Sequence, residues 1–87
     1  MVLMELDPDN MKAVILRMKR ANGHLASVIR MLEEGAECED VITQLAAVNK
    51  AISRSGYAIV ASGLQQCMAA GEVADVQKLE KLFLTLA

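Results

Sequence analysis

Two cysteines, Cys38 and Cys67, stand 29 positions apart at opposite ends of one long helical pattern that contains no other reactive chemistry. A helix rises about 1.5 Å per residue, so one continuous helix would separate the two sulfurs by roughly 43 Å. In an antiparallel two-fold pair, however, Cys38 of one chain lies near Cys67 of the other. The spacing therefore predicts a paired-thiol site between subunits. Two buried structural cysteines are the alternative, because free Cys is among the most buried residue types.

Other catalytic chemistry is sparse. The lone His24 has no His or carboxylate four residues away, so we expect it at a surface or an interface. Ser53 and Ser55 have no plausible His–Asp partners for nucleophilic hydrolysis. A thiol–disulfide enzyme would favour a Cys-x-x-Cys pair near a strand–helix turn, and the chain has no such pair. The sequence predicts that the protein is not an enzyme and needs no cofactor.

The net charge of −2 argues by itself against nucleic-acid binding, but the charges are unevenly distributed. Residues 11–32 and 42–71 contain basic side chains and no acidic one, and the acids gather outside these two stretches. A whole-chain sum hides such a basic surface. The basic residues of these stretches are Lys12, Arg17, Lys19, Arg20, Arg30, Lys50 and Arg54.

The pattern of apolar residues predicts a single all-α domain over residues 1–87, with three helices and a long central one. Asp7 and Pro8 indicate the start of the first helix, and Gly35 its left-handed C-terminal residue. The second helix is expected from Cys38 to about Ala70. The third helix carries a short apolar stripe, Val76, Leu79, Leu82, Phe83 and Leu86.

Composition supports helices that associate. Apolar residues make up 54% of the chain, with one Tyr, one Phe and no Trp, which suits helices rather than sheets. So much apolar surface on 87 residues predicts burial between subunits. The first ten residues lack the pattern of a signal peptide, and no apolar run approaches the ~20 residues that span a membrane. We expect a cytoplasmic protein with reduced thiols.

Two segments resemble the copper-, nickel- and formaldehyde-sensing repressors of the CsoR/RcnR/FrmR family. Arg17–Leu25 (RMKRANGHL) is similar to the family's "LRRIEGQV" segment, and Cys38–Gln44 (CEDVITQ) is similar to its "C-x-D-V-x-T-Q" segment. The likeness covers roughly residues 10–70 and includes the cysteine spacing. It implies an antiparallel dimer that assembles into a disc-shaped homotetramer. It also implies repression of an operon, with release of operator DNA when an inducer binds between subunits.

The chain departs from the family's metal-sensing patterns. Copper sensors have a His four residues before the second Cys, where this chain has Gly63. The N-terminal segment lacks the extra His of nickel and cobalt sensors, and Val2 stands where a formaldehyde sensor has a proline. The remaining two-thiolate site is similar to the persulfide-sensing, CstR-like branch. Two thiolates also suit linear Cu(I). Because the imidazole is missing, we expect no tight Cu(I)-driven release of DNA, and we expect Gly63→His to improve Cu(I) affinity if the interface geometry is right.

The resemblance, the place of Cys38 at a helix N-terminus and the basic stretches together predict roles for the residues singled out above. Reactive sulfur species would be the inducer, with Cys38 as the first attacker and Cys67 of the partner subunit as the resolving thiol. Alternatives are a Cu(I)-responsive repressor and a helical assembly protein that does not bind DNA. The expected DNA contacts are Arg17, Lys19, Arg20 and Arg54, with Lys12 and Lys50 secondary.

Overall fold

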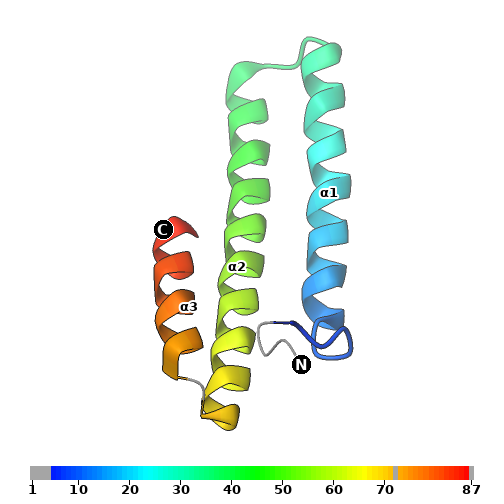
Figure 1. The fold of residues 1–87 in the computed structure, drawn as a ribbon. Helices are drawn as coiled ribbons and strands as arrows, with labels where there is room; N and C mark the ends of the chain where they lie inside the picture. The colour runs from blue at the N-terminus through cyan, green and yellow to red at the C-terminus, as the bar shows by residue number, and fades with distance from the viewer. Residues whose placement is uncertain (1–4, 72, 87) are drawn as a thin grey trace.

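The computed structural model describes residues 5–71 and 73–86, and within them it contains three α-helices and no strand. The helices are α1 (Lys12–Glu33), α2 (Cys38–Ala70) and α3 (Val73–Leu86). Figure 1 shows α2 in the middle, with α1 antiparallel on one side and α3 along its C-terminal half on the other. The prediction of an all-α chain with a long central helix is confirmed.

The single chain forms one layer of helices. Its extents are 52 × 25 × 14 Å, and the smallest of them is close to the ~10–12 Å diameter of one helix with its side chains. Helices α1 and α3 each pack against α2 and not against each other. The dimer and the disc-shaped tetramer stay predictions.

The first helix begins later than the sequence predicts. Asp7 does not cap it; its Oδ1 accepts a hydrogen bond from the Asp9 amide at 3.0 Å, and the chain turns before α1 starts at Lys12. An Asp side chain that bonds its own backbone two residues later favours a turn over a helix. The capping residue is Met11, without a side-chain cap. The predicted start at Asp7 and Pro8 was therefore wrong by about one helical turn.

The other end of α1 confirms the role of Gly35. This residue has φ +74°, and its amide donates to the Leu32 carbonyl at 3.2 Å. The Ala36 amide donates to the Met31 carbonyl at 2.9 Å. These two bonds form a Schellman motif, which satisfies carbonyls that the helix end leaves open. The motif places Cys38 at the first residue of α2.

Small and β-branched side chains join α1 to α2. Val28 and Val48 are each 2% exposed, Val41 is 8% exposed, and half-buried Leu25 and Met31 pack against them. Each fully buried aliphatic side chain of this kind contributes roughly 1.5–3 kcal/mol. This cluster packs the C-terminal half of α1 against the N-terminal half of α2.

Helix α3 packs on a glycine seam of α2. A Cβ on Gly56 would lie 3.1 Å from Leu86 Cδ1, and a Cβ on Gly63 would lie 3.4 Å from Leu79 Cδ2. Seven residues separate both the glycines and the leucines, which is two helical turns. The missing side chains let α3 approach closely, and Leu79 becomes buried.

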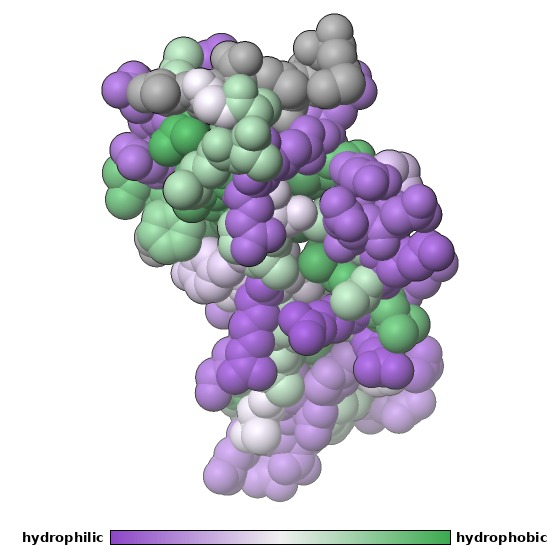
Figure 2. All heavy atoms as spheres, turned by 90° about the horizontal axis from the view of Figure 1, so that it is seen from below, coloured by the Kyte–Doolittle hydropathy of each residue, from purple (hydrophilic) through white to green (hydrophobic). Residues whose placement is uncertain are grey.

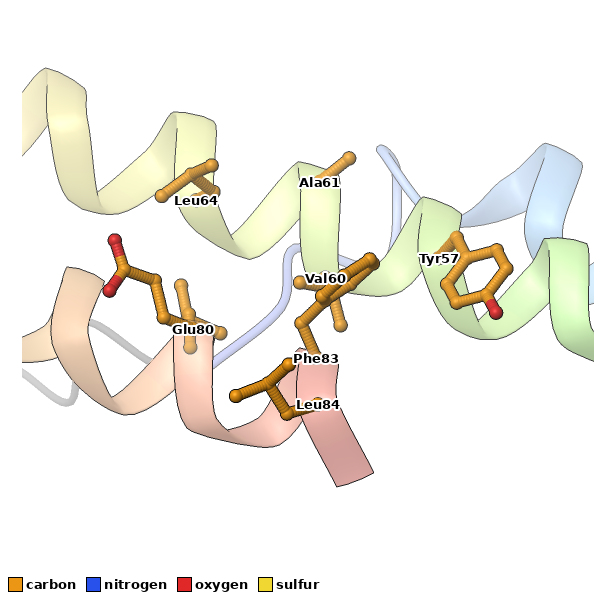
Figure 3. A pocket seen from close by; sticks show the side chains of 8 residues that line it. Tyr57, Val60, Ala61, Leu64, Glu80, Phe83 and Leu84 are labelled. Carbon is orange, nitrogen blue, oxygen red and sulfur yellow. The ribbon is translucent and has the colours of Figure 1, made fainter. Parts of the chain in front are cut away.

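An open apolar hollow of about 490 Å³ lies along the same two helices. Figure 3 shows Leu64, Ala61 and Tyr57 along α2, with Phe83 and Leu84 facing them from α3. The rings of Tyr57 and Phe83 lie 5.4 Å apart between centroids, at 45°. In Figure 2, apolar side chains gather on the α3 side and hydrophilic ones cover the α1 side. The single chain therefore leaves large apolar side chains in contact with solvent.

Candidate sensor thiols and basic hollow

Cys38 is an exposed thiol at the first residue of α2. Glu37 precedes it in extended conformation, and Glu39 and Asp40 follow within the first helical turn. Its exposure leaves Cys38 accessible to a reagent in solution.

Cys67 lies in the last turn of the same helix, before Gly71, and has an exposed fraction of 0%. Solvent therefore does not reach the Cys67 thiol in the described chain, whereas it reaches the thiol of Cys38. One unbroken helix separates the two residues, so their positions are about 43 Å apart along it. A site that uses both thiols therefore needs a second chain.

Gly63 stands where copper sensors of the family have a His, and the side chain of Leu79 packs against it. Gly63 is buried, and methyl carbons of Leu79 lie 3.4 and 3.5 Å from where a Cβ on Gly63 would be. Among residues 5–71 and 73–86, no three His, Cys, Asp or Glu side chains gather as a metal site. Within the described residues, the two thiols are those of Cys38 and Cys67, at opposite ends of α2. Val2, which bears on formaldehyde sensing, lies outside the described residues.

Three arginines meet at a hollow of about 450 Å³ between α1 and α2. Arg17 and Arg20 come from α1 and Arg54 from α2, while Ala21 and Ala51 complete its lining with His24. Arg17, Arg20 and His24 follow at i, i+3 and i+7, which places them on one side of α1. We call this hollow, with its six lining residues, the basic hollow.

His24 also joins the two helices that form the hollow. Its Nε2 lies 2.6 Å from Oε1 of Gln44 on α2. The sequence predicted an interface or surface position for His24 but did not connect it with the arginines. The spacing from Arg17 and Arg20 was the signal that could have revealed this connection.

The structure does not bring the predicted lysines into the hollow. Lys12 lies 3.7 Å from the Asp9 carboxylate in an exposed pair. Lys19 is exposed and is rotated by about 200° from Arg17, because each helical residue turns about 100°. Lys50 is exposed one turn before Arg54 on α2. The arginines thus form the compact part of the predicted basic surface.

An apolar groove lies on the other side of the α1–α2 seam. It is lined by Leu25 of α1 and by Ile42, Leu45 and Ile52 of α2, among others. These three α2 side chains are exposed to solvent, Ile42 by 60%, Leu45 by 47% and Ile52 by 48%. Helical rotation places them across α2 from Arg54. The helical layer therefore has a basic face and an apolar face.

No helix within the described residues is long and apolar enough to cross a membrane.

Comparison with known proteins identifies the family. A family described as "Metal-sensitive transcriptional repressor" matches residues 10–87. The "Copper-sensing transcriptional repressor CsoR" of Mycobacterium ulcerans is 40% identical over 62 residues, covering 71% of this chain and 53% of the relative. Its namesake in Mycobacterium tuberculosis H37Rv is 36% identical over 56 residues, covering 64% and 47%. The "Uncharacterized protein YrkD" of Bacillus subtilis is 45% identical over 38 residues, covering 44% and 60%.

No solved structure matches the chain. The chain spans about half the length of the copper-sensing relatives. The matched family consists of transcriptional repressors, which are not enzymes, as the sequence predicts. With nearly the whole chain matched, the protein belongs to the metal-sensitive transcriptional repressor family.

Proposed function

We propose that this chain is a cytoplasmic repressor that binds operator DNA and releases it when reactive sulfur species join Cys38 to Cys67 of the partner subunit. The observation that carries the proposal is the pair of thiols at the two ends of one helix, with a leucine-packed glycine where an imidazole would complete a metal site. Family membership supports the repressor function, and the thiol pair supports the inducer.

The basic hollow supports DNA binding. Three arginines line it, and no carboxylate residue is among its lining residues. Arginine donates to phosphate through a planar, two-pronged group, and neutralising phosphates releases counterions. Affinity for DNA should therefore fall steeply as salt rises. A helical assembly protein without a DNA function would show no such salt-dependent binding.

The apolar groove supports association of two chains. Monomeric proteins rarely leave large contiguous apolar patches in water. Pairing two chains through the groove that includes Leu25, Ile42, Leu45 and Ile52 would bury this surface and leave both basic hollows outside. An antiparallel arrangement of the two α2 helices would bring each Cys38 toward Cys67 of the partner subunit. We propose this dimer, doubled to a tetramer, as the functional form.

The proposed switch is an exchange of sulfur bonds. The Cys38 thiolate attacks a sulfur atom of a polysulfide, a new S–S bond forms, and the remaining sulfide chain leaves as an anion. The thiolate of Cys67 in the partner subunit then attacks either Sγ of Cys38 or one of the sulfurs added to it, and the sulfurs beyond the attacked atom leave as a second sulfide anion. The two cysteines lose two electrons and the polysulfide gains them. A bridge of two to four sulfurs results, depending on which atom is attacked.

A Cu(I)-responsive repressor is the second candidate. The printed names of the mycobacterial relatives describe copper sensing, and two soft thiolates suit Cu(I). Under this candidate the same two thiols bind the ion without forming a covalent bridge. The absent imidazole is the reason that we place it second.

The test measures binding of the protein to DNA from upstream of its own gene by fluorescence anisotropy. Parallel samples of reduced protein, freed of reductant and kept oxygen-free, receive an inorganic polysulfide or Cu(I). We expect polysulfide to abolish binding and dithiothreitol to restore it, whereas Cu(I) has little effect. Release by Cu(I) alone would establish the second candidate, and no salt-dependent DNA binding at all would overturn the repressor function.

A further inference from the structure

We infer that His24 is a DNA-contacting residue of the basic hollow and that its imidazole takes up one proton when a phosphate of the DNA binds there. The inference rests on the proposed function, because it concerns the same hollow. It adds a property that a repressor does not need: binding of DNA should strengthen as the pH falls from 8 to 6. Histidine is the side chain that ordinarily changes charge close to this range.

His24 forms part of the wall of the hollow. It is half-buried, and it lines the space between α1 and α2 together with three arginines and two alanines. Arg20 lies one helical turn before it on α1 and Arg17 lies two turns before it, so the three side chains follow one side of that helix. The hollow measures about 450 Å³, so a phosphate bound among the arginines lies close to the imidazole.

The contact between His24 and Gln44 determines which ring nitrogen carries the first proton. Nε2 of His24 lies 2.6 Å from Oε1 of Gln44. An amide oxygen accepts hydrogen bonds and donates none, so Nε2 carries a hydrogen and donates it. Nδ1 is then the nitrogen that gains the second proton. The protonated ring still donates from Nε2, so the contact between α1 and α2 is kept in both charge states.

Charged groups face His24 from the two helices that form the hollow. Within the described residues α3 does not contact α1. Asp40 stands one helical turn before Gln44 on α2, but it is not among the lining residues. The charged groups that line the hollow with His24 are three arginines, Arg17 and Arg20 of α1 and Arg54 of α2. A bound phosphate places a negative charge among these groups.

The sign of the pH dependence follows from the two charge states of the ring. Protonated Nδ1 donates a charge-assisted hydrogen bond to a phosphate oxygen, whereas neutral Nδ1 is an acceptor and has no such bond to give. The DNA-bound form therefore holds the proton more tightly than the free form, and binding takes up one proton from the buffer. Affinity is greatest at acidic pH and is lost as the pH rises. Each hollow that holds a phosphate contributes up to about 10-fold per pH unit, because one imidazole takes up at most one proton.

The test measures affinity for DNA from upstream of the protein's own gene between pH 6 and pH 8. Fluorescence anisotropy is recorded at constant ionic strength with both thiols reduced, and we expect the parent to bind more tightly at pH 6. His24→Gln keeps a hydrogen-bonding side chain without a titrating group, so it should match the parent at pH 8 and gain less affinity at pH 6. His24→Arg is permanently charged and should bind at pH 8 at least as tightly as the parent at pH 6. The difference in slope between the parent and His24→Gln isolates the imidazole from other groups that titrate in this range.

A second measurement follows the ring directly in the untagged parent protein. The chain has one histidine, so a single imidazole signal appears in its NMR spectrum. We expect the midpoint of its titration to move to higher pH when the DNA is added. Equal pH dependence in the parent and His24→Gln, or a midpoint that DNA leaves unchanged, would overturn the inference even where salt-dependent binding persists. Absence of salt-dependent binding at every pH would overturn the repressor function and the inference with it.

Discussion

Two substitutions at Gly63 distinguish a vacant ligand position from a packed helix contact. The first is Gly63→Ala. Its Cβ would lie 3.4 and 3.5 Å from the two methyl carbons of Leu79, which is ordinary van der Waals contact. Alanine in a helix interior is about 0.8–1 kcal/mol more favourable than glycine. We therefore expect Gly63→Ala to raise the free energy of unfolding by up to about 1 kcal/mol.

The second substitution is Gly63→His, which restores the side chain of a copper sensor. The imidazole extends beyond Cβ into space that Leu79 fills at 6% exposure. Overpacking of this kind costs about 1–3 kcal/mol and exceeds the few tenths gained from helix propensity. We expect Gly63→His to be less stable than Gly63→Ala. Any gain in Cu(I) affinity, as predicted from the sequence, would require α3 to move or Leu79 to be shortened.

Urea denaturation at fixed protein concentration measures these differences, because association contributes to the stability of an oligomer. Gly56→Ala is the matched control. Its Cβ would lie closer to a leucine, 3.1 Å from Leu86 Cδ1, but Leu86 is 48% exposed and has room to shift. The double variant Gly63→His, Leu79→Ala should recover part of the lost stability. Equal stability of Gly63→His and Gly63→Ala would refute the packing argument.

Three further predictions concern DNA binding and the two-helix layer. Replacing Arg20 and Arg54 together with Ala should weaken DNA binding and reduce the slope of log K against log salt by about two units, measured by anisotropy; an unchanged slope would remove the basic hollow from the interface. Gly35→Ala should cost about 1–2 kcal/mol in urea unfolding, because φ is +74° there; a neutral effect would contradict the Schellman end. Val48→Ala should lower the free energy of unfolding in urea by roughly 1.5–3 kcal/mol, since the side chain is 2% exposed. A loss below about 0.5 kcal/mol would mean that the α1–α2 cluster contributes little to stability.

Much of the fold could be predicted from local sequence signals. The spacing of apolar residues indicated the three helices, and Gly35 marked the end of α1 because only a left-handed residue completes its Schellman motif. The start of α1 was misplaced because Asp7 can serve a turn as well as a cap, and the same residue types favour both. Local signals of this kind do not distinguish the two outcomes.

The site was less accessible to sequence reasoning because it depends on contacts between helices. Basic stretches indicated a positive surface, yet only the pairing of α1 with α2 selects Arg17, Arg20 and Arg54 and leaves Lys19 outside. Gly63 was recognisable as the missing ligand, but the packing of Leu79 against it depends on how α3 folds back. The burial of Cys67 had no local signature either.

The most direct test of the interchain thiol switch mixes two single-cysteine variants. Cys38→Ser keeps only Cys67, and Cys67→Ser keeps only Cys38. After subunit exchange and polysulfide treatment, we expect a covalent dimer in the mixture and none in either variant alone, as measured by intact-protein mass. Peptide mapping should find Cys38 joined to Cys67 through two to four sulfurs. A covalent dimer formed by one variant alone, or none in the exchanged mixture, would contradict the proposed pairing of the two thiols.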